Sequence, residues 1–265
     1  MKKPTTSLVL IFLFLGIAQA HEFWLLPQKF RFNTGDKMIL NFMVGENFEG
    51  EYWDLNRHKV EKLKVINRMT ATDLSSAVKN VPGKHVEYTF NNVGTHLVAM
   101  ESDNAYIELD PQAFAAYLEE DGLEYVKEER VKRGEENSKS RERYRRFAKL
   151  LVQVGERADE TYKKSAEQLL EIMPLKNPYE LATGDYMTCR ILYRDSPEPH
   201  VLVKVWSHLG NRTFLQNIYS ESDGTITFPI SNNGPWMVSS VKMVRANEAG
   251  AEWQSLWSSL VFEIK

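Results

Sequence analysis

Residues 37–44, KMILNFMV, decide the fold. Large apolar side chains stand at every second position from Met38 to Val44, and a period of two is typical of a strand with one buried face. On either side of this stretch, shorter alternating runs are separated by turn signals such as Pro82-Gly83. These runs predict further strands at residues 22–26, 30–32, 60–66, 86–90, 95–100 and 105–109. Short strands at this spacing predict a β-sandwich domain over residues 21–110.

The pattern changes at Asp110-Pro111, where Asp suits a helix N-cap and Pro suits the first helical turn. The helix expected from this start ends near Gly122. The segment at residues 127–146 is rich in both charges and is expected to be a solvated helix face. An apolar stripe at helical spacing predicts another helix over residues 144–154, and a further helix is expected over residues 158–173, ended by Pro174. The sequence therefore predicts a helical insert over residues 111–174.

The last third of the chain returns to alternating runs. Strands are predicted at residues 186–193, 201–206, 213–219, 225–230, 236–244 and 259–265. The single cysteine, Cys189, lies in one of them and is expected to be a small buried hydrophobe. The predicted fold is mainly β with a helical insert, made of two immunoglobulin-like β-sandwich domains, the second over residues 178–265.

The chain begins with the features of a secretory signal peptide over residues 1–20. Lys2 and Lys3 precede a short apolar run, and Ala18-Gln19-Ala20 is a small-x-small cleavage pattern. The run is shorter than the roughly 20 residues that a spanning helix needs, and no later segment is long enough to span a membrane. We therefore expect a periplasmic protein whose mature form is soluble, is not membrane-spanning and begins at His21.

An N-terminal histidine has two nitrogens on one residue that can close a chelate ring on a metal ion. An α-amine has a pKa near ~7.7–8.0 and an imidazole near ~6.5, so both can lose a proton to a metal around neutral pH. Such nitrogens suit copper, nickel and zinc. The alternative is that signal cleavage leaves a histidine first by chance.

Composition and missing motifs exclude several functions. The 265 residues carry a formal net charge of −3, and nothing in the charge distribution indicates nucleic-acid binding. The nucleophile-elbow, zinc-helix, phosphate-loop and dinucleotide-binding signatures are absent from the sequence. We therefore expect a protein that is not an enzyme.

Further ligands would have to come from distant strands, because no two histidines stand two or four residues apart. His96 is the favoured second ligand, since it lies in the same predicted sandwich as His21, and His58 and His85 are the other candidates. Glu22 would point to the opposite face from His21 if the segment is extended.

Several motifs occur in a characteristic order along the chain. These motifs are AHEFWL at residues 20–25, VGENFEG at 44–50, RYRRFAKLLVQVG at 143–155, GPWMV at 234–238 and the spaced Trp and Ser residues of 253–262. In this order they make the chain resemble a bacterial periplasmic family of unknown molecular function that is associated with nickel and cobalt uptake. The resemblance implies two β-sandwich domains around a helical insert, a divalent-metal role and His21 as a ligand. Many relatives have a histidine where this chain has Lys242.

Three functional hypotheses follow. The first is a soluble periplasmic protein that binds a divalent transition metal, nickel or cobalt, and assists its uptake or trafficking, with an envelope metal transporter as partner. The second is a copper-binding protein of the histidine-brace type, acting as a chaperone or an oxidase. The third is a non-catalytic envelope module that binds protein or glycan.

Overall fold

The alternating stretch at residues 37–44 lies within strand β3 (Lys37–Glu46), with Met38, Leu40 and Phe42 completely buried. The structure is a computed structural model that describes residues 21–265, so the expected signal peptide lies outside the described residues. Strand β3 pairs antiparallel with three neighbours in a four-stranded sheet: β1 (Glu22–Pro27), β4 (Glu49–Tyr52) and β7 (Val86–Thr89).

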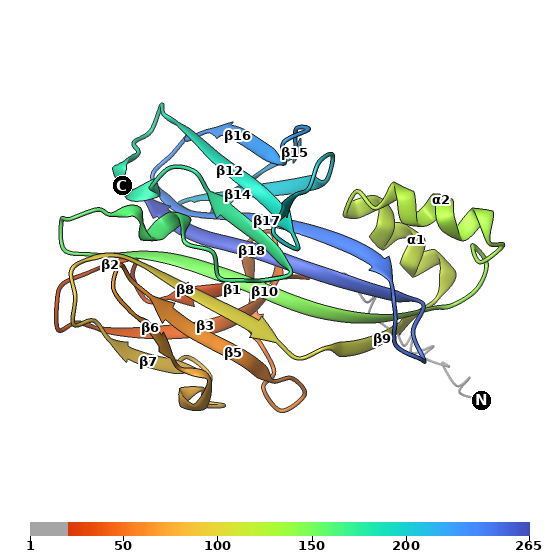
Figure 1. The fold of residues 1–265 in the computed structure, drawn as a ribbon, viewed down its shortest axis with the longest axis horizontal. Helices are drawn as coiled ribbons and strands as arrows, with labels where there is room; N and C mark the ends of the chain where they lie inside the picture. Colours follow the sequence, from red (N-terminus) through yellow and green to blue (C-terminus); the bar gives the residue numbers. More distant parts are fainter. Residues whose placement is uncertain (1–20) are drawn as a thin grey trace, which may run out of the picture.

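A ten-stranded sheet runs through the centre of the molecule (Figure 1). Its main path, in spatial order, is β15 (Arg212–Tyr219), β14 (Leu202–Leu209), β17 (Gly234–Arg245), β18 (Trp253–Ile264), β10 (Ser140–Val154), β8 (Gly94–Ser102), β5 (Val60–Ile66) and β6 (Ala71–Asp73). Two more strands, β2 (Arg31–Phe32) and β9 (Ala105–Leu109), pair with β10. The third sheet contains β11 (Leu170–Pro174), β12 (Tyr186–Tyr193), β13 (Ser196–Pro197) and β16 (Thr225–Pro229).

The central sheet has hydrophobic cores on both faces. One core lies between this sheet and the sheet of β1 and β3, and the other lies between it and the sheet of β12. Cys189 is buried in the second core, as expected. The fold is therefore mainly β, as the sequence predicts. The division into two immunoglobulin-like domains stays a prediction, since the ten-stranded sheet takes strands from residues 21–110, 111–174 and 178–265 alike.

The helix expected over residues 144–154 is wrong, because this segment is the long strand β10. β10 pairs in parallel with β18 and antiparallel with β8, so it joins the earlier and later parts of the chain. Phe147 and Leu151 point into one core, whereas Ala148, Leu150 and Val152 point into the other. A strand that is buried on both faces has a nearly continuous apolar sequence. Such a sequence also has apolar residues at helical spacing, and this is why the sequence predicts a helix there.

The helix expected over residues 158–173 is also wrong. This segment holds only a 3₁₀ turn, Glu160–Lys163, and strand β11. The backbone N–H of Ala166 and the hydroxyl of Ser165 both donate to the buried carboxylate of Glu171. These bonds hold residues 164–169 in a loop, where a helix would need the same groups for its own ladder.

Only the first part of the expected insert is helical. Helices α1 (Pro111–Glu120) and α2 (Glu124–Lys132) follow β9, with Gly122 at φ +65° between them. They lie at one end of the molecule against the extended ends of β9, β10, β17 and β18 (Figure 1). Phe114 and Trp253 are buried in this contact. Two further 3₁₀ turns lie at Ser75–Ala77 and Pro178–Glu180.

The variant Tyr125→Phe tests how α2 is attached. The hydroxyl of Tyr125 donates to the carbonyl of Met243 (2.8 Å) and accepts from its N–H (2.9 Å). Losing both bonds should lower the free energy of unfolding by about 1–2 kcal/mol, measured by urea unfolding. Tyr106→Phe is the matched control, since Tyr106 is about as exposed as Tyr125, at 49% against 44%. A change equal to that of the control would show that the hydroxyl does not anchor the helix.

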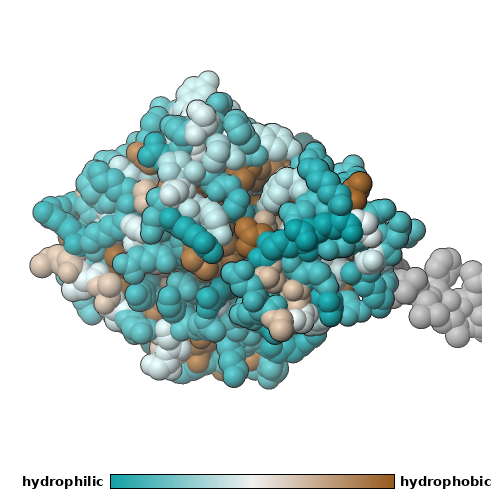
Figure 2. Space-filling view, turned by 45° about the vertical axis from the view of Figure 1, so that its right-hand side comes forward, coloured by the Kyte–Doolittle hydropathy of each residue, from teal (hydrophilic) through white to brown (hydrophobic). Residues whose placement is uncertain are grey.

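The face shown in Figure 2 is mostly hydrophilic, with hydrophobic residues in small groups. Within residues 21–265, no helix is both long enough and apolar enough to cross a bilayer.

Candidate functional site

His21 lies beside Glu46 at one edge of the first sheet. Strand β1 pairs with β3 so that Glu22 is opposite Gly45, and this register carries His21 next to Glu46. Nε2 of His21 is 3.8 Å from Oε1 of Glu46, and both side chains are about two-fifths exposed. The antiparallel pairing thus brings an imidazole and a carboxylate together at the first residue of the expected mature chain.

A pocket of about 240 Å³ opens beside His21. Its walls come from the first sheet, from the overhanging ends of the central sheet and from α1. The lining residues are His21, Val44, Glu51, Ile107, Leu109, Tyr117, Glu142, Tyr144, Arg146 and Trp257. The pocket therefore combines aromatic and aliphatic walls with acidic, basic and imidazole groups, as small-molecule sites do.

Glu142 is the most deeply buried charged group in this pocket, at 2% exposure. Its Oε1 accepts hydrogen bonds from the hydroxyls of Ser255 and of Tyr117 (3.3 Å). Its Oε2 has no hydrogen-bond partner among the described residues. Burial raises the pKa of Glu142 to about 7, with the two hydroxyl donors opposing the shift.

Arg146 lies four residues further along β10, on the same face as Glu142. Its guanidinium is 4.9 Å from the ring centroid of Tyr144 and 5.5 Å from that of Phe23. Within residues 21–265, its Nε has no hydrogen-bond partner. Burial lowers the pKa of Arg146, although the group stays a cation at any physiological pH.

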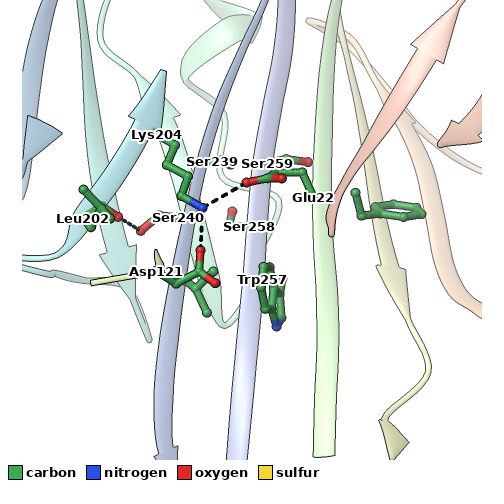
Figure 3. Close-up of a pocket in the computed structure, with 11 residues that line it drawn as sticks. Glu22, Asp121, Leu202, Lys204, Ser239, Ser240, Trp257, Ser258 and Ser259 are labelled. Atoms are coloured by element: carbon green, nitrogen blue, oxygen red, sulfur yellow. Dashed lines mark hydrogen bonds and ion pairs between the residues drawn. The ribbon is translucent and has the colours of Figure 1, made fainter. Parts of the chain in front are cut away.

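A second, much smaller pocket contains a buried ion cluster (Figure 3). Nζ of Lys204 is 2.8 Å from Asp121 and 3.4 Å from Glu22. Burial raises the pKa of Asp121 to about 7, and the Lys204 ammonium opposes this rise. With room for about 10 Å³, this pocket holds no more than a water molecule. The cluster ties β1 to β14 and to the end of α1.

Glu22 therefore belongs to a different site from His21. Its carboxylate is held by Lys204, and it lines the small pocket. His21 lines the large one. This confirms the expectation that the two side chains leave the extended strand on opposite faces.

His85 and His96 are buried in the first core. Nδ1 of His85 accepts the N–H of Phe42 (3.0 Å), and the two rings are stacked. Nδ1 of His96 lies 3.1 Å from the carbonyl of Gly94, and its Nε2 has no partner among the described residues. Burial lowers the pKa of both imidazoles, which favours their neutral form.

His58 lies nearer to the large pocket but does not line it. Its ring stacks on Trp53 and meets the ring of Tyr144 edge-on at 6.2 Å. Its Nδ1 is 3.8 Å from Asp103. Burial, and then the cation of Arg146, lower the pKa of His58.

The structure does not bring the predicted ligands together. His21 lines the large pocket, whereas His58, His85 and His96 are absent from the lining described for it. Over residues 21–265, no group of three or more His, Cys, Asp and Glu side chains could hold a metal ion. The ligand role of the three internal histidines stays a prediction, and the structure gives it no shared site with His21.

Lys242, where the resemblance implies a histidine in many relatives, is not among the residues that line the pocket of His21. Its ammonium is 2.6 Å from Glu198 and lies over the rings of Tyr125 and Tyr193. None of these residues lines the pocket of His21.

Sequence reasoning missed Glu46, Glu51 and Glu142. Glu46 stands at the end of β3, and only strand pairing places it beside His21. Glu142 lies within the charged segment that is expected to be solvated. Nothing in the sequence indicates that Glu142 is buried while its charged neighbours are exposed. Its burial arises because α1 and β18 cover it.

The variant Glu142→Gln should flatten the pH dependence of stability. The folded pKa of Glu142 is about 7, against an ordinary value of 4.5 for a glutamate, so the folded state binds an extra proton between these values. The resulting stabilisation is fully present below the unfolded pKa and is lost as pH rises through about 7, by up to about 1.4 kcal/mol per pH unit. Melting temperatures at pH 5 and pH 8 measure it. An equal fall with rising pH in both proteins would contradict the assignment.

Comparisons with known proteins complete the description. A family model described as "Domain of unknown function (DUF4198)" matches residues 18–243. Among curated proteins, none matches the chain.

Two solved structures show weak similarity. One is a tetra-tandem repeat in the extending region of a large adhesion protein, with 10% identity and a TM-score of 0.24, covering 93% of this chain. This chain spans 50% of that repeat structure. The other contains three N-terminal domains of the Highly Immunogenic Outer Capsid protein (Hoc) of bacteriophage RB49, with 7% identity and a TM-score of 0.25. This match covers 92% of the present chain and 71% of the capsid-protein chain.

Proposed function

We propose that the chain, which belongs to the DUF4198 family, a domain of unknown function, is a periplasmic protein that binds a divalent transition-metal ion, nickel or cobalt, at its mature N-terminus. The ion is cargo, which the protein carries to an envelope transporter. The single observation that carries the proposal is the placement of His21 beside Glu46, at the mouth of a pocket that Glu51 also lines.

The donor atoms suit such an ion. Cleavage after Ala20 would add the α-amine of His21 to its imidazole, and the carboxylate of Glu46 is already adjacent. Two nitrogens and a carboxylate oxygen form a set that nickel, cobalt, copper and zinc all accept. Side chains alone make no closed site in residues 21–265, so the proposal depends on the amine. The choice of nickel or cobalt rests on the sequence resemblance.

The side-chain contribution is tested with Glu46→Gln in the mature form that begins at His21. Loss of the carboxylate should weaken Ni(II) binding by about tenfold, measured by calorimetric titration. Glu248→Gln is the matched control, because it removes the same charge from an exposed side chain that pairs with Arg143. Equal affinity of the two variants would remove Glu46 from the site.

The metal itself is tested separately. The mature protein should bind Ni(II) and Co(II) more tightly than a variant with His21→Ala. A stronger preference for Cu(II) in vitro would not decide the physiological metal, because most nitrogen sites bind Cu(II) more tightly than Ni(II). Elemental analysis of protein isolated from the periplasm identifies the cargo. No binding of Ni(II), Co(II), Cu(II) or Zn(II) above that of the His21→Ala variant would overturn the proposal.

A further inference from the structure

The inner wall of the large pocket carries two opposite charges that lack complete hydrogen bonding. Oε2 of Glu142 and Nε of Arg146 are both buried and both lack a partner among the described residues. Both residues line the pocket. Buried polar atoms are rarely left unpaired, since each has lost its hydrogen bonds to water and needs a replacement. The pair therefore indicates a ligand with a donor for one atom and an acceptor for the other.

The two groups stand apart along one strand. Glu142, Tyr144 and Arg146 occupy alternate positions of β10 and so share one face. Four residues of extended strand separate the two Cα atoms by roughly 13 Å. The ring of Tyr144 lies between them along the strand. The guanidinium of Arg146 lies over that ring. A ligand that meets both charges must therefore carry two charged groups, and the length of the ligand that binds best measures their separation.

Much of the remaining pocket lining is apolar and aromatic. The rings of Tyr117 and Trp257 are stacked, with centroids 5.7 Å apart, and both line the pocket. Ile107, Leu109 and Val44 supply aliphatic contacts. Such walls favour a carbon chain or a flat ring between two charged ends.

We propose that this pocket binds a small zwitterionic organic molecule, with its ammonium group at Glu142, its carboxylate at Arg146 and its apolar middle against Trp257 and Tyr117. An ammonium donates to Oε2 of Glu142, and a carboxylate accepts from the guanidinium of Arg146. A simple anion would leave Oε2 of Glu142 without a donor, and a simple cation would leave Nε of Arg146 without an acceptor. The site is distinct in chemistry from the proposed metal site, and it does not require a metal.

The pKa of Glu142 agrees with this assignment. Burial raises it to about 7, so the carboxyl is partly neutral in the empty pocket. A neighbouring ammonium favours the ionised form, which strengthens the pair once the ligand has entered.

The experiment uses zwitterions of increasing length as a ruler. The mature protein, stripped of metal with a chelator, is titrated calorimetrically with glycine, γ-aminobutyrate and ε-aminocaproate. Hexanoate and hexylamine serve as probes with a single charge. We expect one of the longer zwitterions to bind at least about tenfold more tightly than glycine and than either probe with a single charge. No length preference, or equal binding of hexanoate or hexylamine, would overturn the proposal.

Variants connect the binding to the two charges. Glu142→Gln and Arg146→Gln should each weaken the preferred zwitterion by about tenfold or more, whereas Glu248→Gln should not. Thermal unfolding checks that each variant is folded, and Tyr117→Phe provides a milder change in the same wall. Binding unaffected by both charge changes would contradict the site. Because the titration uses metal-free protein, its failure leaves the metal proposal standing, and loss of metal binding alone leaves the zwitterion site standing.

Discussion

Blocking the α-amine of His21 should weaken Ni(II) binding by about 100-fold, which corresponds to ~2.7 kcal/mol. The amine and the imidazole of one residue close a chelate ring, and the amide of an extended chain does not replace the amine at neutral pH. The test adds Gly-Ser-Gly-Ser before His21. Four residues are chosen because an amine only one or two residues before a histidine forms its own chelate through the intervening amide nitrogens.

The extension keeps every side chain of the site, including Glu46, which lies 3.8 Å from the imidazole. Calorimetric titration compares the extended form with the form that begins at His21, and mass spectrometry verifies both N-termini. The control carries the same four residues after Lys265. If the N-terminal extension leaves the affinity unchanged, the ion does not use the amine, and the proposed site is wrong.

Replacing Lys149 by Met should lower the free energy of unfolding by about 3–5 kcal/mol. Lys149 and Glu171 form an ion pair at 2.8 Å whose side chains are 0% and 1% exposed. The variant leaves a carboxylate buried without its cation. Desolvation is costly for an isolated charge, so the loss should exceed that of any surface pair.

The double variant Lys149→Met with Glu171→Gln should recover much of this stability. A neutral amide removes the unpaired charge. Its oxygen can accept from the N–H of Ala166, and its NH2 can donate to the hydroxyl oxygen of Ser165. Lys132→Met is the surface control, since both side chains of the Lys132–Glu128 pair are exposed, at 76% and 69%. Urea unfolding measures all four proteins. If Lys149→Met is no less stable than the surface control, the buried pair contributes nothing. If Lys149→Met does not fold, recovery of folding in the double variant tests the same prediction.

Strand prediction succeeded where one face of a strand is buried. The bounds predicted for residues 60–66, 105–109 and 186–193 are those observed for β5, β9 and β12. Such strands show their alternation in the sequence, because solvent accepts polar side chains on the other face. The helix start at Pro111 was also predictable, since the N-cap residue and the proline are local signals.

Prediction failed where burial depends on distant parts of the chain. β10 is covered on both faces, so its apolar run carries no period that distinguishes strand from helix. Glu142 and Arg146 stand in a charged run whose exposure is the usual expectation, yet Tyr117 and Ser255 enclose the first of them. Only residues far along the chain supply these contacts.

The sequence by itself determined the β-rich class and the first helix, because each depends on residues that are close together in the chain. The chelate at His21 stays a proposal drawn from the sequence. Only the tertiary structure decided that His21 lies beside Glu46, that Glu22 is held by Lys204 and that Glu142 and Arg146 share a pocket wall. The physical reason is that strand register and burial arise from pairing between distant segments. These set the distances and the desolvation on which a binding site depends.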